Sequence, residues 1–154
     1  MSYEQLKLEN QICFPLYAAS RLITRAYQDD LDALDITYPQ YLVLMVLWEF
    51  EELTVNEIAE KLILKTNTVT PLLKRMEAQQ LLMREQSKTD QRKVLITLTG
   101  KGRNLQISAA EIPFRLVNKL NSSGNEIKLE EALELKSRLY KLINLLESSE
   151  QKRS

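Results

Sequence analysis

The sequence contains a single cysteine, Cys13, and no histidine. Cys13 lies two residues before Pro15, at the start of a stretch with helical periodicity. At a helix start the dipole and the free backbone N–H groups favour a thiolate, the form of cysteine that attacks a peroxide. The alternative is a small buried packing residue, which is the usual state of an isolated cysteine. The composition excludes a disulfide framework, a zinc finger and a histidine-dependent catalytic triad.

A second set of side chains suits DNA. No acidic residue occurs between Lys61 and Met76. Hydroxyl and cationic groups at helical spacing can contact phosphates, and an amide or hydroxyl can reach base edges in the major groove. Asn67 and Thr70 are the candidates for base contacts. The alternative is an ordinary solvated helix face. The full set of candidate residues on this helix is Thr66, Asn67, Thr68, Thr70, Lys74 and Arg75.

A predicted β-hairpin follows this helix directly. Two strand-like patterns, Leu82–Glu85 and Val94–Thr99, flank the polar segment QSKTDQRK. Cations on such a loop could reach the DNA backbone or the adjacent minor groove, and Asp90 could pair with an arginine to shape the loop. A helix-turn-helix followed by a hairpin indicates a winged helix, which favours DNA binding over the solvated-face reading. The candidate wing residues are Lys88, Asp90, Arg92 and Lys93.

The charges are strongly separated along the chain. Residues 61–103 contain ten Lys or Arg and three Asp or Glu, whereas residues 28–60 contain nine acidic residues and no Lys or Arg. The formal net charge of zero therefore conceals a basic segment that coincides with the predicted DNA-binding elements.

Helical periodicity and capping signals predict the elements that carry these residues. Thr37 and Thr54 are the expected N-caps of two helices, and Glu57 completes a capping box with Thr54. The segment 64–67 is expected to be the turn of the helix-turn-helix. The predicted helices are Pro15 to about Leu34, Pro39 to about Phe50, Val55–Leu62, Thr68 to about Gln80, and amphipathic segments at about Thr99–Lys119 and Glu126–Leu146.

We therefore predict a mainly α fold with a small β-hairpin wing, in which a winged helix-turn-helix is flanked by N- and C-terminal dimerisation helices. Residues 1–154 are expected to form one unit, with 37–99 as the DNA-binding part, 1–36 and 100–148 as dimerisation helices and 149–154 as a flexible tail. The longest apolar run, Tyr41–Trp48, is too short to span a membrane, and the N-terminus lacks signal-peptide features. We expect a cytoplasmic protein with no membrane partner.

Several motifs resemble a known family. Asp90-Gln-Arg92 followed by Val94–Gly102 is similar to the wing of the multiple antibiotic resistance regulator (MarR) family, whose members are dimeric winged-helix transcription factors. The segments 8–17 and 37–49, together with Tyr27, resemble the organic hydroperoxide resistance regulators (OhrR type), in their one-cysteine form. The resemblance covers essentially the whole chain. Two residues depart from the family pattern. Pro15 replaces an ordinary helix former near Cys13, and Gln80 replaces the glycine usual at the end of the recognition helix, at some cost in C-cap stability.

The resemblance implies a homodimeric repressor of a double-stranded DNA operator, without enzymatic activity, cofactor or bound metal. Organic hydroperoxide would oxidise Cys13 to a sulfenic acid, and the DNA would be released. The acid would then be capped by a small thiol or over-oxidised, and Cys13-to-Cys13 pairing across the dimer stays open. In the family, tyrosines of the partner subunit hydrogen-bond the reactive sulfur. The matching positions are Tyr27 and Tyr38, with Tyr17 as a third candidate and ordinary packing as the alternative.

Three other functions compete with this interpretation. The first is a MarR-type repressor released by a small phenolic or aromatic ligand without cysteine chemistry. The second is a thiol peroxidase using Cys13 with Arg21 or Arg25, which would have no resolving cysteine. The third is a helical scaffold that binds protein through its acidic half, which the absence of salt-dependent DNA binding would favour.

Overall fold

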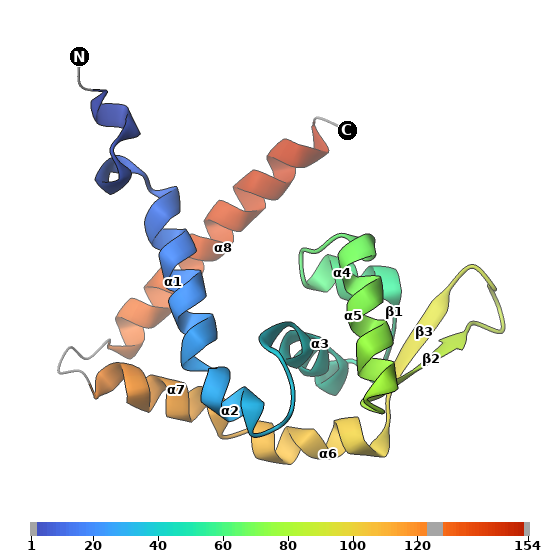
Figure 1. The fold of residues 1–154 in the computed structure, drawn as a ribbon. Coiled ribbons are helices and arrows are strands. Elements are labelled where there is room, and N and C mark those ends of the chain that lie inside the picture. Colours follow the sequence, from blue (N-terminus) through green and yellow to red (C-terminus); the bar gives the residue numbers. More distant parts are fainter. Residues whose placement is uncertain (1–2, 123–127, 153–154) are drawn as a thin grey trace. The chain divides into compact units, whose positions relative to one another are not determined.

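The computed structural model describes residues 3–122 and 128–152. Figure 1 shows helices joined to one small sheet, so the predicted mainly α fold with a β-hairpin is confirmed. Among the described helices, none combines the length and the apolar composition that crossing a membrane requires. The elements are two short 3-10 helices, Glu4–Leu6 and Leu8–Asn10, helices α1 (Cys13–Ala26), α2 (Gln28–Asp32), α3 (Tyr38–Glu49), α4 (Val55–Lys61), α5 (Thr66–Ala78), α6 (Gly100–Ala109), α7 (Ile112–Asn121) and α8 (Leu129–Gln151), and strands β1 (Glu52–Thr54), β2 (Leu82–Gln86) and β3 (Val94–Leu98).

The chain divides into two compact units, Met1–Pro113 and Phe114–Ser154. The sequence predicted a single unit over residues 1–154, with one dimerisation segment over 100–148. The division falls within α7, which buries Ile112 in the first unit. No described side chain of α8 is buried, so this helix contributes nothing to a core of the kind that defines a domain.

Helix α3 forms the centre of the first unit. It is apolar nearly all round and buries Tyr41, Val43, Leu44 and Leu47, as expected for a helix surrounded by other elements. The predicted N-cap is confirmed, because the Thr37 N–H donates to the side chain of the third helical residue at 2.8 Å. The rest of the core is contributed mainly by α4, α5 and the sheet: Ile58, Ala59, Val69, Leu72, Leu73, Met76, Leu82, Ile96 and Leu98.

Helix α4 begins as the sequence predicted. The Glu57 N–H donates to Thr54 Oγ1 at 3.2 Å, and the Thr54 N–H donates to Glu57 Oε2 at 2.7 Å, which completes the capping box. These bonds lower the pKa of Glu57, first through the backbone N–H of Thr54 and then through its hydroxyl, with Lys93 and Lys61 adding to the effect. The cap fixes the angle at which α4 leaves the sheet.

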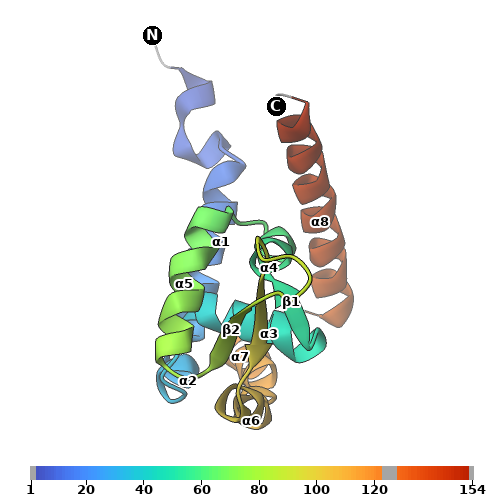
Figure 2. The same cartoon turned by 90° about the vertical axis from the view of Figure 1, so that its right-hand side faces the viewer.

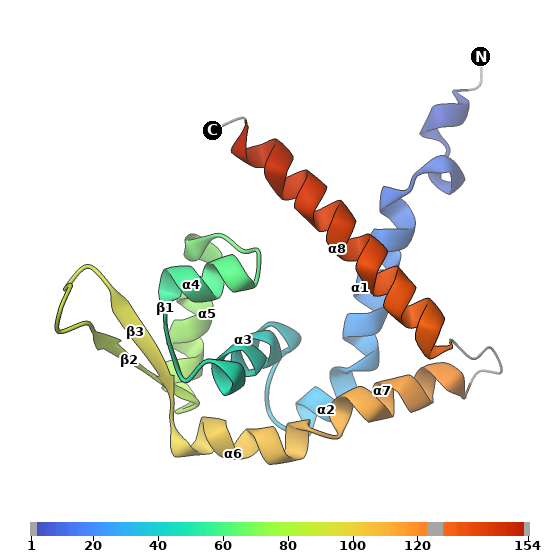
Figure 3. The same ribbon diagram turned by 180° about the vertical axis from the view of Figure 1, so that it is seen from behind.

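The sheet contains a strand that the sequence did not predict. Its order is β1-β3-β2, both pairs are antiparallel, and Ile96 of β3 lies opposite both Leu53 and Arg84. Figures 2 and 3 show the β2–β3 hairpin extending beyond α5, with β1 alongside β3. Strand β1 is only three residues long and begins at an acidic residue, so it lacked the alternating apolar pattern of a strand.

The main differences from the predicted boundaries lie in four helical segments. The predicted helix from Pro15 is broken at Tyr27, which ends α1 and turns its ring towards α3. The segment from Thr99 is also broken, because Pro113 lacks an N–H and is tolerated only in the first turn of a new helix, α7. Helix α5 begins at Thr66 rather than Thr68. Helix α8 continues to Gln151, so residues 149–151 of the predicted tail are helical, whereas the predicted start at residue 126 and residues 153–154 lie outside the described residues.

Candidate DNA-binding face and thiol site

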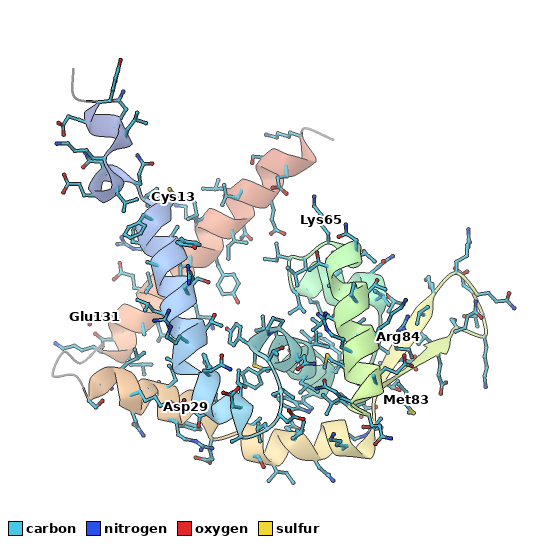
Figure 4. All side chains as sticks on the ribbon, viewed as in Figure 1. Cys13, Asp29, Lys65, Met83, Arg84 and Glu131 are labelled. Carbon is cyan, nitrogen blue, oxygen red and sulfur yellow. The ribbon has the colours of Figure 1, made fainter. Side chains whose placement is uncertain are left out.

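The first turn of α5 carries three of the predicted DNA-binding residues. Thr66, Asn67 and Thr68 are exposed and helical, so the prediction that residues 64–67 form a turn was wrong for the last two. The N–H groups of Thr68 and Val69 both donate to the carbonyl of Lys65, which starts the helix earlier than the periodicity indicated. Lys65 is exposed and immediately precedes α5, at the N-terminal end of this helix (Figure 4). Lys65 was not among the candidates predicted from the sequence, although Thr66 and Asn67 of the same predicted turn were.

The structure divides the remaining α5 candidates between two sides of the helix. Thr70 lies near the hairpin, although its hydroxyl proton is donated to the Thr66 carbonyl at 2.8 Å, which leaves only its lone pairs for an outside donor. Lys74 is exposed. Arg75 lines a different pocket, with Asp32 and Asp35 beside it, and so is not grouped with Thr66 and Thr70.

The hairpin loop is held by its own side chains. Both the backbone N–H and Nε of Arg92 donate to Asp90 Oδ1, at 3.1 and 3.2 Å, which confirms the predicted pairing. Ser87, only 7% exposed, accepts from the Asp90 N–H at 3.4 Å. Because the Arg92 side chain is 92% exposed, the ion pair contributes shape more than stability. Lys88 and Lys93 are also exposed, so the loop presents cations on a defined backbone.

A pocket of about 450 Å³ connects the two DNA-binding elements. It is lined by Thr66 and Thr70 of α5 and by Arg84, Arg92 and Lys93 of the hairpin, among others. Arg84 is a further candidate that sequence reasoning missed. It pairs with Glu77 at 3.3 Å, and its buried Nε has no hydrogen-bond partner among the described residues. The opening is lined by these three cations and by the Glu57 carboxylate, so its net charge is positive, which suits a phosphate group.

Cys13 is exposed and is the first residue of α1, as Figure 4 shows. The predicted position at a helix start is confirmed. Within the single chain Cys13 is not packed in the core, and its role as a reactive thiol stays a prediction. The Cys13 thiol donates weakly to Gln11 Oε1 at 3.9 Å. Among the described residues, Tyr17 forms no hydrogen bond with this thiol, although it lies one helical turn further along α1. The Tyr17 hydroxyl instead accepts from Arg21 Nη1 at 2.9 Å, and the same guanidinium lies 5.6 Å from the ring centroid.

Three tyrosines form a cluster between the end of α1 and α3. The ring centroids of Tyr27 and Tyr38 are 5.3 Å apart, and Tyr41 lies 6.0 and 6.4 Å from them. Burial raises the pKa of all three above 10.0, and the neighbouring rings add to the effect for Tyr27. Their hydroxyls therefore stay protonated and able to donate at neutral pH. Sequence reasoning missed Tyr41, although its spacing of three residues from Tyr38 places both on one helix face.

Cys13 and this cluster lie at opposite ends of α1. The helix spans 14 residues, so at about 1.5 Å per residue its two ends are about 20 Å apart. The structure thus brings Tyr27 and Tyr38 together, as the predicted network requires, but leaves Cys13 and Tyr17 away from them within one chain.

Residues 25–108 match the family described as Transcriptional regulator SarA/Rot. Over 144 residues the chain is 48% identical to the organic hydroperoxide resistance transcriptional regulator of Bacillus subtilis (strain 168), a match that covers 94% of this chain and 95% of the relative. The chain belongs to the MarR/SarA-type winged-helix transcriptional regulators.

Solved structures of two further proteins extend the comparison. AbfR has been solved in its reduced form bound to DNA, and a further structure is of AbfR from Staphylococcus epidermidis. The DNA-bound reduced form is 38% identical to this chain with a TM-score of 0.77. The match covers 96% of this chain and 98% of AbfR. AbfR is further known in an overoxidized form on DNA and in a disulfide form. The organohalide-sensing regulator RdhR in its 2,4-dichlorophenol-bound form is 26% identical with a TM-score of 0.79, and covers 94% of this chain and 84% of its own. The Bacillus subtilis relative and RdhR are both named as transcriptional regulators, and AbfR is solved on DNA.

Proposed function

We propose that this regulator is a homodimeric repressor that senses organic hydroperoxide through Cys13 and then releases its operator. The observation that carries the proposal is an exposed thiol at the start of α1 in a chain that also contains a cluster of protonated tyrosines. The high identity to a regulator named for organic hydroperoxide resistance supports the choice of oxidant.

The distance along α1 argues for a dimer. Tyrosine hydroxyls can stabilise a thiolate only within hydrogen-bonding distance, and the cluster of the same chain is about 20 Å away along the helix. A second copy could supply its Tyr27 and Tyr38 to Cys13. Large apolar side chains that are exposed in the single chain give such a copy a surface to cover: Phe14, Leu22 and Ile23 on α1, and Leu133, Leu135, Leu145 and Leu146 on α8. The helical segments in 1–36 and 100–148 are thus the proposed dimer contacts.

The chemistry balances without a cofactor. The Cys13 thiolate attacks the terminal oxygen of the hydroperoxide, an S–O bond forms, and the O–O bond breaks. The sulfur loses two electrons, and the leaving alkoxide takes a proton to become an alcohol. A small thiol then attacks the sulfenic sulfur, which forms a mixed disulfide and releases water. No second cysteine exists in the chain for an intrachain disulfide.

Oxidation would act on DNA binding through the tyrosines. A neutral, larger sulfur group no longer offers the negative charge that tyrosine hydroxyls stabilise. The charge-assisted hydrogen bonds that would fix the positions of these tyrosines are then lost. Tyr38 is the first residue of α3, and α3 packs against α5. A shift there would change the spacing of the two recognition helices, whose proposed DNA contacts are Thr66, Asn67, Thr68, Thr70, Lys74 and Arg75, with wing contacts from Lys88, Arg92 and Lys93 positioned by Asp90.

The test is fluorescence-anisotropy titration of DNA from upstream of the protein's own gene, at several salt concentrations. Three samples are compared: reduced protein, protein treated with an organic hydroperoxide and a small thiol, and Cys13→Ser given the same treatment. Tight binding by reduced protein, release after oxidation and retained binding by Cys13→Ser would support the proposal. Equal affinity of wild-type protein before and after verified oxidation would refute it.

A second candidate is release by a phenolic ligand without cysteine chemistry. RdhR is known with 2,4-dichlorophenol bound, and this chain has an open pocket of about 540 Å³ beside α5, lined in part by Arg75 and Gln79. If 2,4-dichlorophenol lowers the DNA affinity of Cys13→Ser as much as that of wild type, while peroxide has no effect on either, this second function replaces the first.

A further inference from the structure

Gln40 is one of two polar residues that are buried among the described residues, with 4% of its surface exposed. Its side-chain oxygen accepts from the Thr37 N–H at 2.8 Å, and its Nε2 donates to Gln79 Oε1 at 2.6 Å. The orientation of this amide follows from chemistry, because an atom that faces a backbone N–H must be an acceptor. Both polar atoms of the Gln40 amide are thus hydrogen-bonded, the oxygen to the N-cap residue of α3 and the nitrogen to the residue that follows α5.

Gln79 lies at the other end of this bond and closes the recognition helix. Its N–H donates to the Arg75 carbonyl at 3.0 Å, and its own carbonyl accepts from Lys101 Nζ at 2.9 Å. The next residue, Gln80, has a φ of 60°, and its carbonyl accepts from Thr99 Oγ1 at 2.6 Å. The backbone at the end of α5 is therefore held by the start of α6, whereas the Gln79 side chain bonds to α3.

The tyrosine cluster lies on the same turn of α3 as Gln40. Tyr38 precedes Gln40 by two residues, Tyr41 follows it directly, and both rings contact Tyr27. A rotation of the first turn of α3 that repacked these rings would also displace the Gln40 side chain, because buried side chains on one turn move together.

We propose that Gln40 is a positioning residue that transmits the state of the tyrosine cluster to α5 through its hydrogen bond to Gln79. The inference rests on the proposed function, and it identifies the contact through which that function would reach the DNA-binding helix.

The surroundings of the bond allow it to be made or broken. The pocket of about 540 Å³ beside α5 is lined by both Gln40 and Gln79 and is open to water. Gln79 is only partly buried and lines this pocket, so its side chain can exchange the bond to Gln40 for one to solvent. The net stability of such a bond is small, on the order of 1 kcal/mol, which suits a contact that must switch.

The test uses two substitutions of similar size at one position. Gln79→Met removes the acceptor, whereas Gln79→Glu keeps an oxygen that Gln40 Nε2 can reach. For each variant, the DNA Kd is measured before and after treatment with an organic hydroperoxide and a small thiol. The ratio of the two Kd values cancels any direct effect of the new charge on DNA affinity. Urea unfolding checks that each variant is folded.

We expect the oxidised-to-reduced Kd ratio of Gln79→Met to be about tenfold smaller than that of wild type, which corresponds to one hydrogen bond. Gln79→Glu should keep the wild-type ratio. A wild-type ratio in Gln79→Met would overturn the proposal, and so would an equal loss in both variants, because then the hydrogen bond is not what matters.

A double-mutant cycle separates this inference from the proposed function. In reduced protein, Tyr27→Ala and Gln79→Met are combined, and their effects on DNA Kd are compared with those of the single variants. If the bond couples the cluster to α5, the Kd change of the double variant should differ about tenfold from the product of the two single changes. If wild type does not respond to peroxide but the cycle is non-additive, the proposed function fails and the coupling stands. If the cycle is additive, the coupling fails.

Discussion

The winged-helix region and helix α1 place their apolar side chains in opposite environments. In the winged helix, α3, α4, α5 and the sheet enclose one core, with Val43, Leu44, Ile58 and Leu73 fully buried. Helix α1 buries no residue, and Leu22, 60% exposed, is typical of its apolar side. Helix α8 resembles α1 in this respect. The core of the winged helix is therefore formed within one chain, whereas the apolar sides of α1 and α8 stay exposed in the single chain and are the surfaces that the proposed dimer would cover.

The largest expected effect is on the core. Leu73→Ala should lower the free energy of unfolding by about 2–5 kcal/mol, because it removes buried methyl groups and leaves a cavity. Urea unfolding followed by circular dichroism measures the loss, which should be independent of protein concentration. A loss under about 1 kcal/mol would mean that the winged helix is not the stable core of the chain.

A truncation of the same size on α1 provides the contrast. Leu22→Ala should weaken self-association by tenfold or more if Leu22 lies at the centre of the proposed dimer contact. Sedimentation equilibrium measures the change. At concentrations where the variant has dissociated, its unfolding midpoint should depend on protein concentration less strongly than that of wild type. Unaltered association would remove α1 from the interface.

A smaller effect is expected at the start of α4. Thr54→Ala removes both the N-cap and a hydrogen bond to Glu57, and should cost about 1 kcal/mol. In wild type the lowered pKa of Glu57 adds stability that is present above its ordinary value of 4.5 and is lost as the pH falls through the folded value. The stability of Thr54→Ala should therefore change less with pH below 4.5. Thr54→Ser, which keeps the cap oxygen, is the control and should behave as wild type.

The smallest expected effect is a gain in folding stability, at Gln80. Gln80 has a φ of 60°, a conformation that glycine adopts at little cost. Gln80→Gly should stabilise the winged helix by about 0.5–1 kcal/mol, partly offset by the greater freedom of glycine in the unfolded chain. Thermal unfolding detects this as a rise in Tm. A fall in Tm would mean that the Gln80 side chain makes a contribution larger than its backbone strain.

Features set by residues near one another in sequence were predictable. The capping box of Thr54 and Glu57, the pairing of Asp90 with Arg92 and the helix start at Cys13 each span only a few residues, and all are present. The strain at Gln80 was also foreseen, because a glycine is expected at that position.

Features that depend on distant residues were not predictable in this way. The residue at which α1 ends, Tyr27, has ring contacts with α3, and the bond between Gln40 and Gln79 joins residues 39 positions apart. Arg84 fell within the predicted strand Leu82–Glu85 without an assigned role, and only the structure places it in a pocket with Arg92. The hydrophobic periodicity of a sequence carries no information on contacts between distant residues. It also carries none on contacts with another molecule, so the dimer contacts and the DNA contacts stay predictions.

Trp48 is the only tryptophan in the chain, and it stands where α3 meets the start of α6. Its indole N–H donates to the Gly102 carbonyl at 3.0 Å, and its ring lies 6.2 Å from that of Tyr41 in an edge-on arrangement. The protein thus has a built-in optical reporter. Emission from this one fluorophore, excited directly or by energy transfer from the tyrosine cluster, should follow rearrangements at the end of the recognition helix in unlabelled protein and in real time.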